Sequence, residues 1–356
     1  MQNAVGELHQ PVLVETCVKL LAPALTYSSA QQPPVLVDAT LGLGGHAEAI
    51  LRAYPDVRIV GIDRDGQARR LAAQRLAEFD ERLTIVAATY GDLDRILNQQ
   101  GIRRVDAILA DLGVSSLQLD EEARGFAYST PAAPLDMRMD QSQGFSAADF
   151  LAAADAAEIA EVLRRYGEEK FAWKIAKNIV AARRDAPLST CGELADLVKA
   201  SIPAPARRRG GNPAKRTFQA LRVAVNDELG DLQRFLAQGL KALKVGGRMA
   251  VESYQSLEDR LVKQAFANGI HPETPKGLPI VPAANSPWLA DLTHGAVQAD
   301  AAEIASNPRS ASVRLRAVEK LSEPGSEKYA AGETADRREN LMTTLEKLRR
   351  STSEGD

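Results

Sequence analysis

Residues 35–51, VLVDATLGLGGHAEAIL, decide the fold of this chain. They run from a short apolar segment, typical of a buried strand, through a glycine cluster into a helical pattern. Gly42, Gly44 and Gly45 lie between the strand and the helix, where a glycine-rich loop lets the backbone approach a ligand closely. Three kinds of ligand use loops of this type: a nucleoside triphosphate, a nicotinamide dinucleotide and S-adenosylmethionine.

The residues around the glycines discriminate among these ligands. A triphosphate-binding loop ends in Gly-Lys-Ser/Thr, whereas His46 follows Gly45 here. A dinucleotide fold places its first glycine directly after the strand, but here Asp38 ends the strand and would repel a pyrophosphate. A carboxylate instead attracts a cation, and S-adenosylmethionine carries an ammonium and a sulfonium group. We therefore predict S-adenosylmethionine as the cofactor, with Asp38 in its site.

Further strand-like segments follow the glycine loop, at residues 58–63, 83–87 and 105–111. They alternate with helical patterns, so the sequence predicts an α/β fold with a doubly wound, mostly parallel sheet. Asp63 and Asp111 end two of these segments, as Asp38 ends the first, and ligands bind at the carboxyl edge of such sheets. An acid in the position of Asp63 typically accepts the ribose hydroxyls of either cofactor. Taken together, the three acids favour a ligand site over the alternative in which Asp38 is only a turn residue.

The pattern changes after the fourth strand, because the chain becomes turn-rich and is then helical from about residue 146 to 202. SAAD and TCGE, which begin at Ser146 and Thr190, resemble capping boxes that open helices. Strand and helix patterns then resume, including one long helix predicted over residues 218–243. We predict a discontinuous α/β domain, an inserted all-helical substrate-recognition subdomain and a charged, flexible tail, with the boundaries 1–118 and 213–322, 119–212, and 323–356.

Composition narrows the function classes. The 356 residues carry a formal net charge of −3, so any nucleic acid must be bound by a local basic patch. No apolar run approaches the ~18 residues of a membrane span, and no signal peptide is visible. Cys17 and Cys191 lie far apart and in no metal-binding spacing. We expect a cytoplasmic protein without a membrane segment, a disulfide or a metal site.

Nine short motifs occur in a characteristic order along the chain. They are HQPVL (9–13), DATLGLGGH (38–46), GIDRD (61–65), DLGVSSLQLD (111–120), RGF (124–126), PLDMRMD (134–140), NPAKRTFQALRVAVNDEL (212–229), SLEDR (256–260) and NPRS (307–310). Together they resemble the bacterial small-subunit ribosomal RNA cytosine-N4 methyltransferase family, over residues 9 to roughly 320. Two positions depart from the family pattern: Leu117 replaces a proline, and Gln255 replaces a histidine before SLEDR.

The resemblance implies a Rossmann-like class I methyltransferase with a helical insert. Such an enzyme transfers a methyl group from S-adenosylmethionine to the exocyclic N4 of a cytidine in the decoding region of 16S ribosomal RNA. Asp111 is then either the acceptor of an amino proton or a cofactor contact, and the sequence leaves both roles open. By resemblance the cofactor-binding residues are Gly44, Gly45, His46, Asp63, Tyr90, Asp111 and Gln118, to which the charge argument adds Asp38.

The RNA partner requires a basic surface, and the densest basic run is RRRGGNPAKR, residues 207–216. Tyr254 keeps an aromatic ring where the family has phenylalanine. The small ribosomal subunit is the expected partner, and a homodimer is among the expected assemblies. Two alternatives remain: a non-catalytic RNA-binding assembly factor, and a methyltransferase with another substrate. The residues predicted to contact RNA are Arg207, Arg208, Arg209, Lys215, Arg216 and Tyr254.

Overall fold

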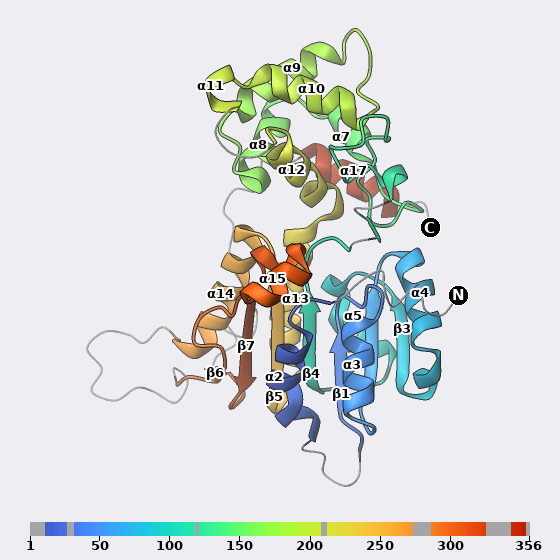
Figure 1. Ribbon diagram of the computed structural model, residues 1–356, viewed down its shortest axis with the longest axis vertical. Helices are drawn as coiled ribbons and strands as arrows, with labels where there is room; N and C mark the ends of the chain where they lie inside the picture. Colours follow the sequence, from blue (N-terminus) through green and yellow to red (C-terminus); the bar gives the residue numbers. More distant parts are fainter. Residues whose placement is uncertain are drawn as a thin grey trace, which may run out of the picture. The chain divides into compact units, whose positions relative to one another are not determined.

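The computed structural model describes residues 11–26, 32–115, 117–118, 121–207, 212–272, 286–324 and 343–353. The chain divides into two compact units, each formed by two stretches of sequence (Figure 1). The first unit comprises Met1–Gly113 and Leu229–Thr334. The second comprises Val114–Glu228 and Ala335–Asp356.

A seven-stranded sheet forms the centre of the first unit, in the order β3-β2-β1-β4-β5-β7-β6. The first five strands of the chain run parallel, and β7 is antiparallel to both of its neighbours. Because β1 lies between β2 and β4, the chain winds outward from this point in both directions, which confirms the predicted doubly wound sheet. The strands are β1 (Val35–Asp38), β2 (Arg58–Asp63), β3 (Leu83–Ala87), β4 (Val105–Asp111), β5 (Leu243–Ser253), β6 (Leu289–Asp291) and β7 (Arg314–Lys320).

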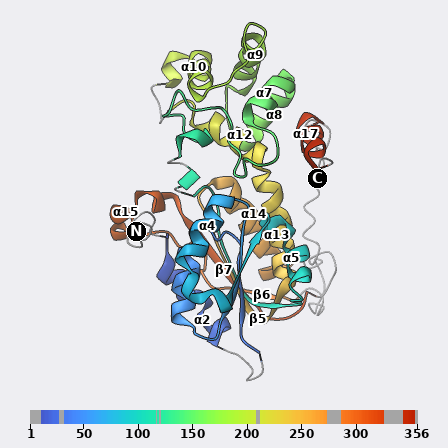
Figure 2. The ribbon, with the colours of Figure 1, turned by 90° about the vertical axis from the view of Figure 1, so that its right-hand side faces the viewer.

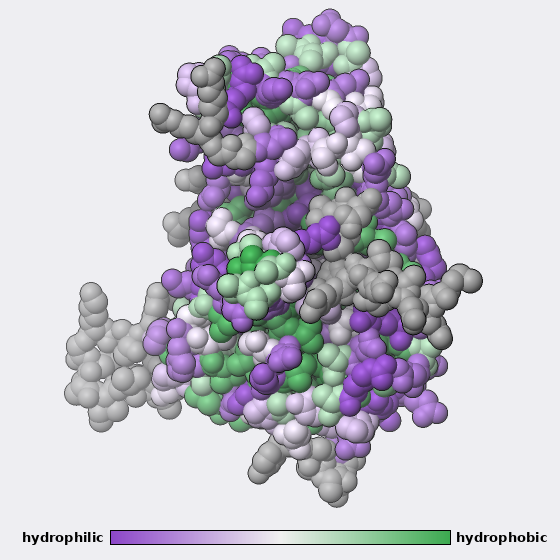
Figure 3. All heavy atoms as spheres, viewed as in Figure 1, coloured by the Kyte–Doolittle hydropathy of each residue, from purple (hydrophilic) through white to green (hydrophobic). Residues whose placement is uncertain are grey.

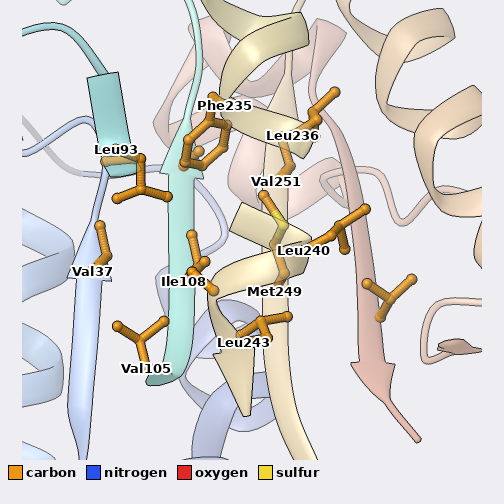
Figure 4. Close-up of a cluster of buried hydrophobic side chains, with 14 of the residues drawn as sticks. Val37, Leu93, Val105, Ile108, Phe235, Leu236, Leu240, Leu243, Met249 and Val251 are labelled. Atoms are coloured by element: carbon orange, nitrogen blue, oxygen red, sulfur yellow. The ribbon is translucent and has the colours of Figure 1, made fainter. Parts of the chain in front are cut away.

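Helices cover both faces of this sheet (Figure 2). Neighbouring strand residues point to opposite faces, so Leu36 packs on one side while Val37 packs on the other. Figure 4 shows the second of these cores, where Ile108 of β4 lies beside Phe235. One face carries α2 (Val14–Thr26), α3 (Gly45–Ala53) and α4 (Gly66–Arg75), and the other carries α5 (Leu93–Gln99), α13 (Glu228–Ala242) and α14 (Ser256–Ile270).

Short elements complete the first unit: η1 (Ala77–Arg82), η2 (Tyr90–Asp92), α15 (Ala301–Ser306) and η5 (Pro308–Ser312). Apolar side chains gather around α2 and α15 on the face shown in Figure 3.

None of the helices in the described part of the chain combines the length and apolar character needed to cross a membrane.

The second unit is helical, as predicted. Its first and fourth long helices begin with the two predicted capping boxes, Ser146 with Asp149 and Thr190 with Glu193. A third capping box, Asp155 with Glu158, opens the second long helix. The helices are α7 (Ala147–Ala153), α8 (Ala156–Gly167), α9 (Ala172–Ala182), α10 (Cys191–Ser201), α11 (Ala204–Arg207), α12 (Lys215–Asn226) and α17 (Thr343–Ser353), with the short turn η3 (Glu122–Arg124) before them.

The boundaries of this unit differ from those predicted. We assigned the segment after residue 212 to the α/β domain, but α12 belongs to the helical unit and packs on α8. The contact is close: a Cβ atom on Gly167 would lie 2.5 Å from the carbonyl oxygen of Arg216. The long helix predicted over 218–243 is also two helices, because Asp227 takes a left-handed conformation (φ 52°) between α12 and α13.

The predicted flexible tail contains a helix. This helix, α17, belongs to the second unit. The Thr344 backbone N–H donates to Glu158 at 2.7 Å, and Arg349 forms an ion pair with Asp227 at 3.0 Å. These polar contacts dock a segment whose weak apolar periodicity gave no sign of packing.

The Ser146 cap allows a direct test of the second unit. Its hydroxyl accepts a hydrogen bond from the Asp149 backbone N–H, which has no partner within the helix. We expect Ser146→Ala to lower the free energy of unfolding by about 1 kcal/mol, measured by urea denaturation. A loss below about 0.3 kcal/mol would contradict a stabilising role for this cap.

Candidate functional site

Three carboxylates lie at the same edge of the sheet in the first unit. Asp63, Asp38 and Asp111 end β2, β1 and β4, which are adjacent strands. Backbone contacts connect these strand ends: the Asp111 N–H donates to the Thr40 hydroxyl at 2.6 Å, and the Gly42 N–H donates to Asp63 Oδ2 at 2.8 Å. The structure therefore brings together the three acids that the sequence placed at strand ends.

Asp38 is the most constrained of the three. Its side chain is only 2% exposed, and burial raises the pKa of its carboxyl group from 3.8 to about 7, with further contributions from Asp111 and Asp63. The Thr40 N–H donates to Oδ1 at 3.2 Å, whereas Oδ2 is buried without a hydrogen-bond partner among the described residues. A buried carboxylate oxygen without a partner suits a cationic ligand. Asp38 thus fits the ammonium end of S-adenosylmethionine.

The glycine loop is shaped by backbone conformation and by close packing. Gly44 takes a left-handed conformation (φ 79°) at the N-cap of α3, and a Cβ there would lie 2.7 Å from Leu76. At Gly45 a Cβ would lie 2.2 Å from Pro11, so the segment before α2 covers the loop at this point. The loop leaves the first N–H groups of α3 free of helical partners, which is where a cofactor carboxylate is expected.

His46 lies in this first turn of α3, but its side chain has a structural contact. The imidazole is buried, and Nε2 lies 3.0 Å from the carbonyl oxygen of Val12. The ring therefore ties α3 to the segment that precedes α2. Its predicted role in the cofactor site rests on the backbone N–H rather than on the imidazole.

Asp63 holds the glycine loop through backbone contacts. Besides the bond from Gly42 to Oδ2, the Asp65 N–H donates to Oδ1 at 2.8 Å, and burial raises the pKa of Asp63. Each oxygen keeps a lone pair, so the carboxylate retains the capacity to accept ribose hydroxyls.

Tyr90 begins η2, which lies in the loop after β3. Its ring packs edge-on against Phe235, with centroids 5.3 Å apart. The preceding residue, Thr89, donates to the buried carboxylate of Asp231 at 2.5 Å, and Asp231 also pairs with Arg64. This network fixes the loop that carries Tyr90, and no pattern in the sequence predicts it.

Asp111 is held by a side chain that we predicted to contact RNA. The Tyr254 hydroxyl donates to Asp111 Oδ1 at 2.8 Å, and burial raises the pKa of Tyr254 far above its ordinary value. Tyr254 therefore stays protonated and remains a donor. It orients the Asp111 carboxylate, and its predicted stacking on RNA stays a prediction.

A buried cluster lies beside Asp111. Glu252 of β5 lies next to Asp111 of β4 in the register of these parallel strands. Burial raises the pKa of Glu252 well above its ordinary value. The Cys17 thiol donates to Glu252 Oε1 at 3.5 Å, and His46 Nε2 lies 3.7 Å from Glu252 Oε2. These three side chains place ligand atoms within 4.8 Å of one another, a group that could hold a metal ion. We predicted no metal site because these residues are far apart in sequence.

The SLEDR motif has a structural role at the end of β5. Glu258 accepts the backbone N–H groups of Tyr254 and Gln255 at 3.0 and 3.1 Å, which fixes the turn into α14. Asp259 accepts from Arg316 of β7 at 2.7 Å. Gln255, which departs from the family pattern, lies at the N-cap of this helix. Because backbone N–H groups hold the turn, glutamine in place of histidine changes only the side chain at this position.

The remaining predicted residues belong to the second unit. Gln118 is buried, and its Oε1 accepts from the Ser115 N–H at 3.1 Å. Lys215 and Arg216 are exposed at the start of α12, and Arg207 ends α11 half-buried. Arg208 and Arg209 lie outside the described residues.

Fold and site together define the class of the protein. Its sheet order, the antiparallel β7, the glycine loop after β1 and the acids that end β1 and β2 are those of a class I, S-adenosylmethionine-dependent methyltransferase. The model of the MraW methylase family matches residues 6–321. The chain belongs to that family.

Several close relatives are named Ribosomal RNA small subunit methyltransferase H. The Beutenbergia cavernae protein is 55% identical over 314 residues, which cover 88% of this chain and 93% of the relative. A relative from Nocardioides sp. is 55% identical over 317 residues, with 89% and 98% covered. Among solved structures, an rRNA methylase from Streptococcus thermophilus aligns over 88% of this chain and 99% of its own, at 13% identity and a TM-score of 0.40.

Proposed function

We propose that this enzyme transfers a methyl group from S-adenosylmethionine to the exocyclic N4 of a cytidine in the decoding region of 16S ribosomal RNA, in the cytoplasm. The observation that carries the proposal is the 55% identity, over nearly the whole length, to proteins named for small-subunit ribosomal RNA methylation. The N4 target rests on the resemblance in the motifs. A homodimer stays an expectation.

The first unit supplies the cofactor site. Asp38 offers a buried carboxylate oxygen without a partner to the ammonium group, and Asp63 offers acceptors to the ribose. The remaining predicted contacts in this unit are Gly44, Gly45, the backbone of His46 and Tyr90. Gln118 belongs to the second unit, and its contact with the cofactor stays a prediction. S-adenosylmethionine supplies an electrophilic methyl group on its sulfonium. The protein's own contribution is to hold the attacking amine close and in line.

Asp111 carries the proposed proton transfer. The lone pair of a cytosine amine is delocalised into the ring, so an acceptor for an amino proton helps to localise it. Asp111 ends β4 with Oδ1 bound by the Tyr254 hydroxyl, which fixes the orientation of the carboxylate next to Glu252. The same placement suits a cofactor contact. Kinetics and cofactor-binding measurements on Asp111→Asn separate the two roles.

The second unit supplies the proposed RNA contacts. The target base has to leave its stack to reach a cofactor. The phosphates on either side of this base are negatively charged and need cationic partners on the protein. Changing Arg207, Arg208 and Arg209 together to glutamine should lower RNA affinity about tenfold and leave cofactor affinity unchanged. Filter binding and calorimetry measure the two affinities. Equal losses of both, or no loss of either, would contradict this assignment.

The substrate class is tested with methyl-labelled S-adenosylmethionine. The purified chain is offered small ribosomal subunits, naked 16S RNA and a protein extract in parallel. We expect label in 16S RNA and none in protein. Label in protein or a small molecule would identify a methyltransferase with another substrate, and RNA binding without label would identify an assembly factor.

A further inference from the structure

The second unit carries a cationic surface that the sequence motifs do not include. Helix α9 packs on both α8 and α10. Its buried side consists of Ala172, Ile175, Ala176 and Ile179. The opposite side is exposed and, with residues at both ends of the helix, forms what we call the α9 cationic face: Lys170, Trp173, Lys174, Lys177 and Arg184.

Trp173 is the unusual member of this face. It is 46% exposed, and the other two exposed large apolar residues in the described part of the chain, Val245 and Leu321, are aliphatic. Lys177, one helical turn later, lies over the indole ring with its ammonium 5.3 Å from the ring centroid. The indole is therefore a flat aromatic surface flanked by lysines, an arrangement that suits stacking on a base next to phosphates.

The charges of the face are also available for a partner. None of its cations forms an ion pair with a carboxylate among the described residues. The sequence of α9 contains no acid, and Asp185 directly follows Arg184 at the end of the face. This cluster of positive charge contrasts with the net charge of −3 of the whole chain.

We infer that the α9 cationic face binds RNA, with Trp173 stacked on an unpaired base and the lysines on the adjacent phosphates. Single-stranded RNA presents this combination of a flat base and regular negative charge. An acidic protein would satisfy the cations but would leave the stacking surface of the indole without a matching ring. The inference rests on the proposed function, because it extends the contact with the ribosomal RNA substrate.

Binding of the full-length chain to a naked 16S RNA fragment tests the proposal. Trp173→Ala should weaken binding about tenfold, since stacking on an aromatic side chain contributes substantially per base. Trp173→Phe should restore affinity to within about threefold of the parent because it keeps an aromatic ring. Changing Lys174 and Lys177 to glutamine should lower the slope of log affinity against log salt by about 1.4, or about 0.7 for each phosphate contact.

The matched control is Lys263→Gln, which removes one exposed lysine from α14 in the first unit and should leave RNA affinity unchanged. Cofactor affinity and thermal unfolding should be the same in all variants. If Trp173→Ala binds naked RNA like the parent, the proposal is wrong, and a loss seen only with assembled subunits would identify a ribosomal protein as the partner instead. Failure of the parent itself to bind RNA would count against the proposed function as a whole.

Discussion

Replacing Asp111 by asparagine should lower kcat/KM for methyl transfer about 100-fold or more. The substitution preserves shape but removes the negative charge that either role of this residue requires. Steady-state kinetics with 16S RNA or subunits, together with calorimetry of cofactor binding, separate the roles. A fall in kcat at unchanged cofactor affinity assigns proton acceptance, whereas a loss of cofactor affinity assigns a cofactor contact. A kcat/KM within about threefold of the parent would remove Asp111 from the site.

The control for this prediction is Tyr254→Phe, which keeps the ring and removes only the hydroxyl that donates to Asp111. Loss of one hydrogen bond of this kind costs about 0.5–1.5 kcal/mol, so we expect a fall in activity of roughly 2- to 12-fold. An effect as large as that of Asp111→Asn would show that Tyr254 has a role of its own in the reaction.

The second large effect is expected at Asp38. Asparagine at this position should weaken S-adenosylmethionine binding about 100-fold, because the buried carboxylate oxygen that meets the ammonium group loses its charge. Since the pKa of Asp38 is about 7, the affinity of the parent should fall about tenfold per pH unit below pH 7. Asp38→Asn should abolish this pH dependence, which calorimetry between pH 5.5 and 8 measures. A parent affinity that does not vary with pH would contradict the assignment.

The free energy of unfolding without cofactor provides an independent check, because the contribution of Asp38 to it should change with pH in the opposite direction to cofactor affinity. The folded-state pKa of Asp38 lies above its ordinary value of 3.8, so the folded chain binds the extra proton between these pH values. The contribution of Asp38 to stability is therefore present below pH 4 and is lost as the pH rises to about 7. Asp38→Asn should accordingly be more stable than the parent at pH 8 and no more stable at pH 4.

Much of the fold followed from local patterns in the sequence. The strands that end at Asp38, Asp63 and Asp111 are mostly apolar, and the capping boxes at Ser146 and Thr190 are fixed by neighbouring residues, so both are visible without tertiary information. The extent of the second unit was not visible in the same way. It depends on long-range packing and polar contacts, including that of Thr344 with Glu158.

The site was predictable to a similar degree. Position at a strand end predicted the three acids of the site. The contacts that hold the Tyr90 loop were not predictable, because Asp231 is distant in sequence from Thr89, whose hydroxyl donates to it. Glu252 was the one missed residue with a visible signal, because an acid inside the apolar run RMAVESY is unusual for a buried strand. Its neighbours Cys17 and His46 gave no such signal.

The identity of the methylated nucleoside tests the central claim most directly. Small subunits that lack the modification are incubated with the purified chain and methyl-labelled S-adenosylmethionine, and the 16S RNA is digested and analysed by mass spectrometry. The account predicts label in N4-methylcytidine, at a single cytidine of the decoding region. Label on carbon 5, on a ribose hydroxyl or in another nucleoside would contradict it.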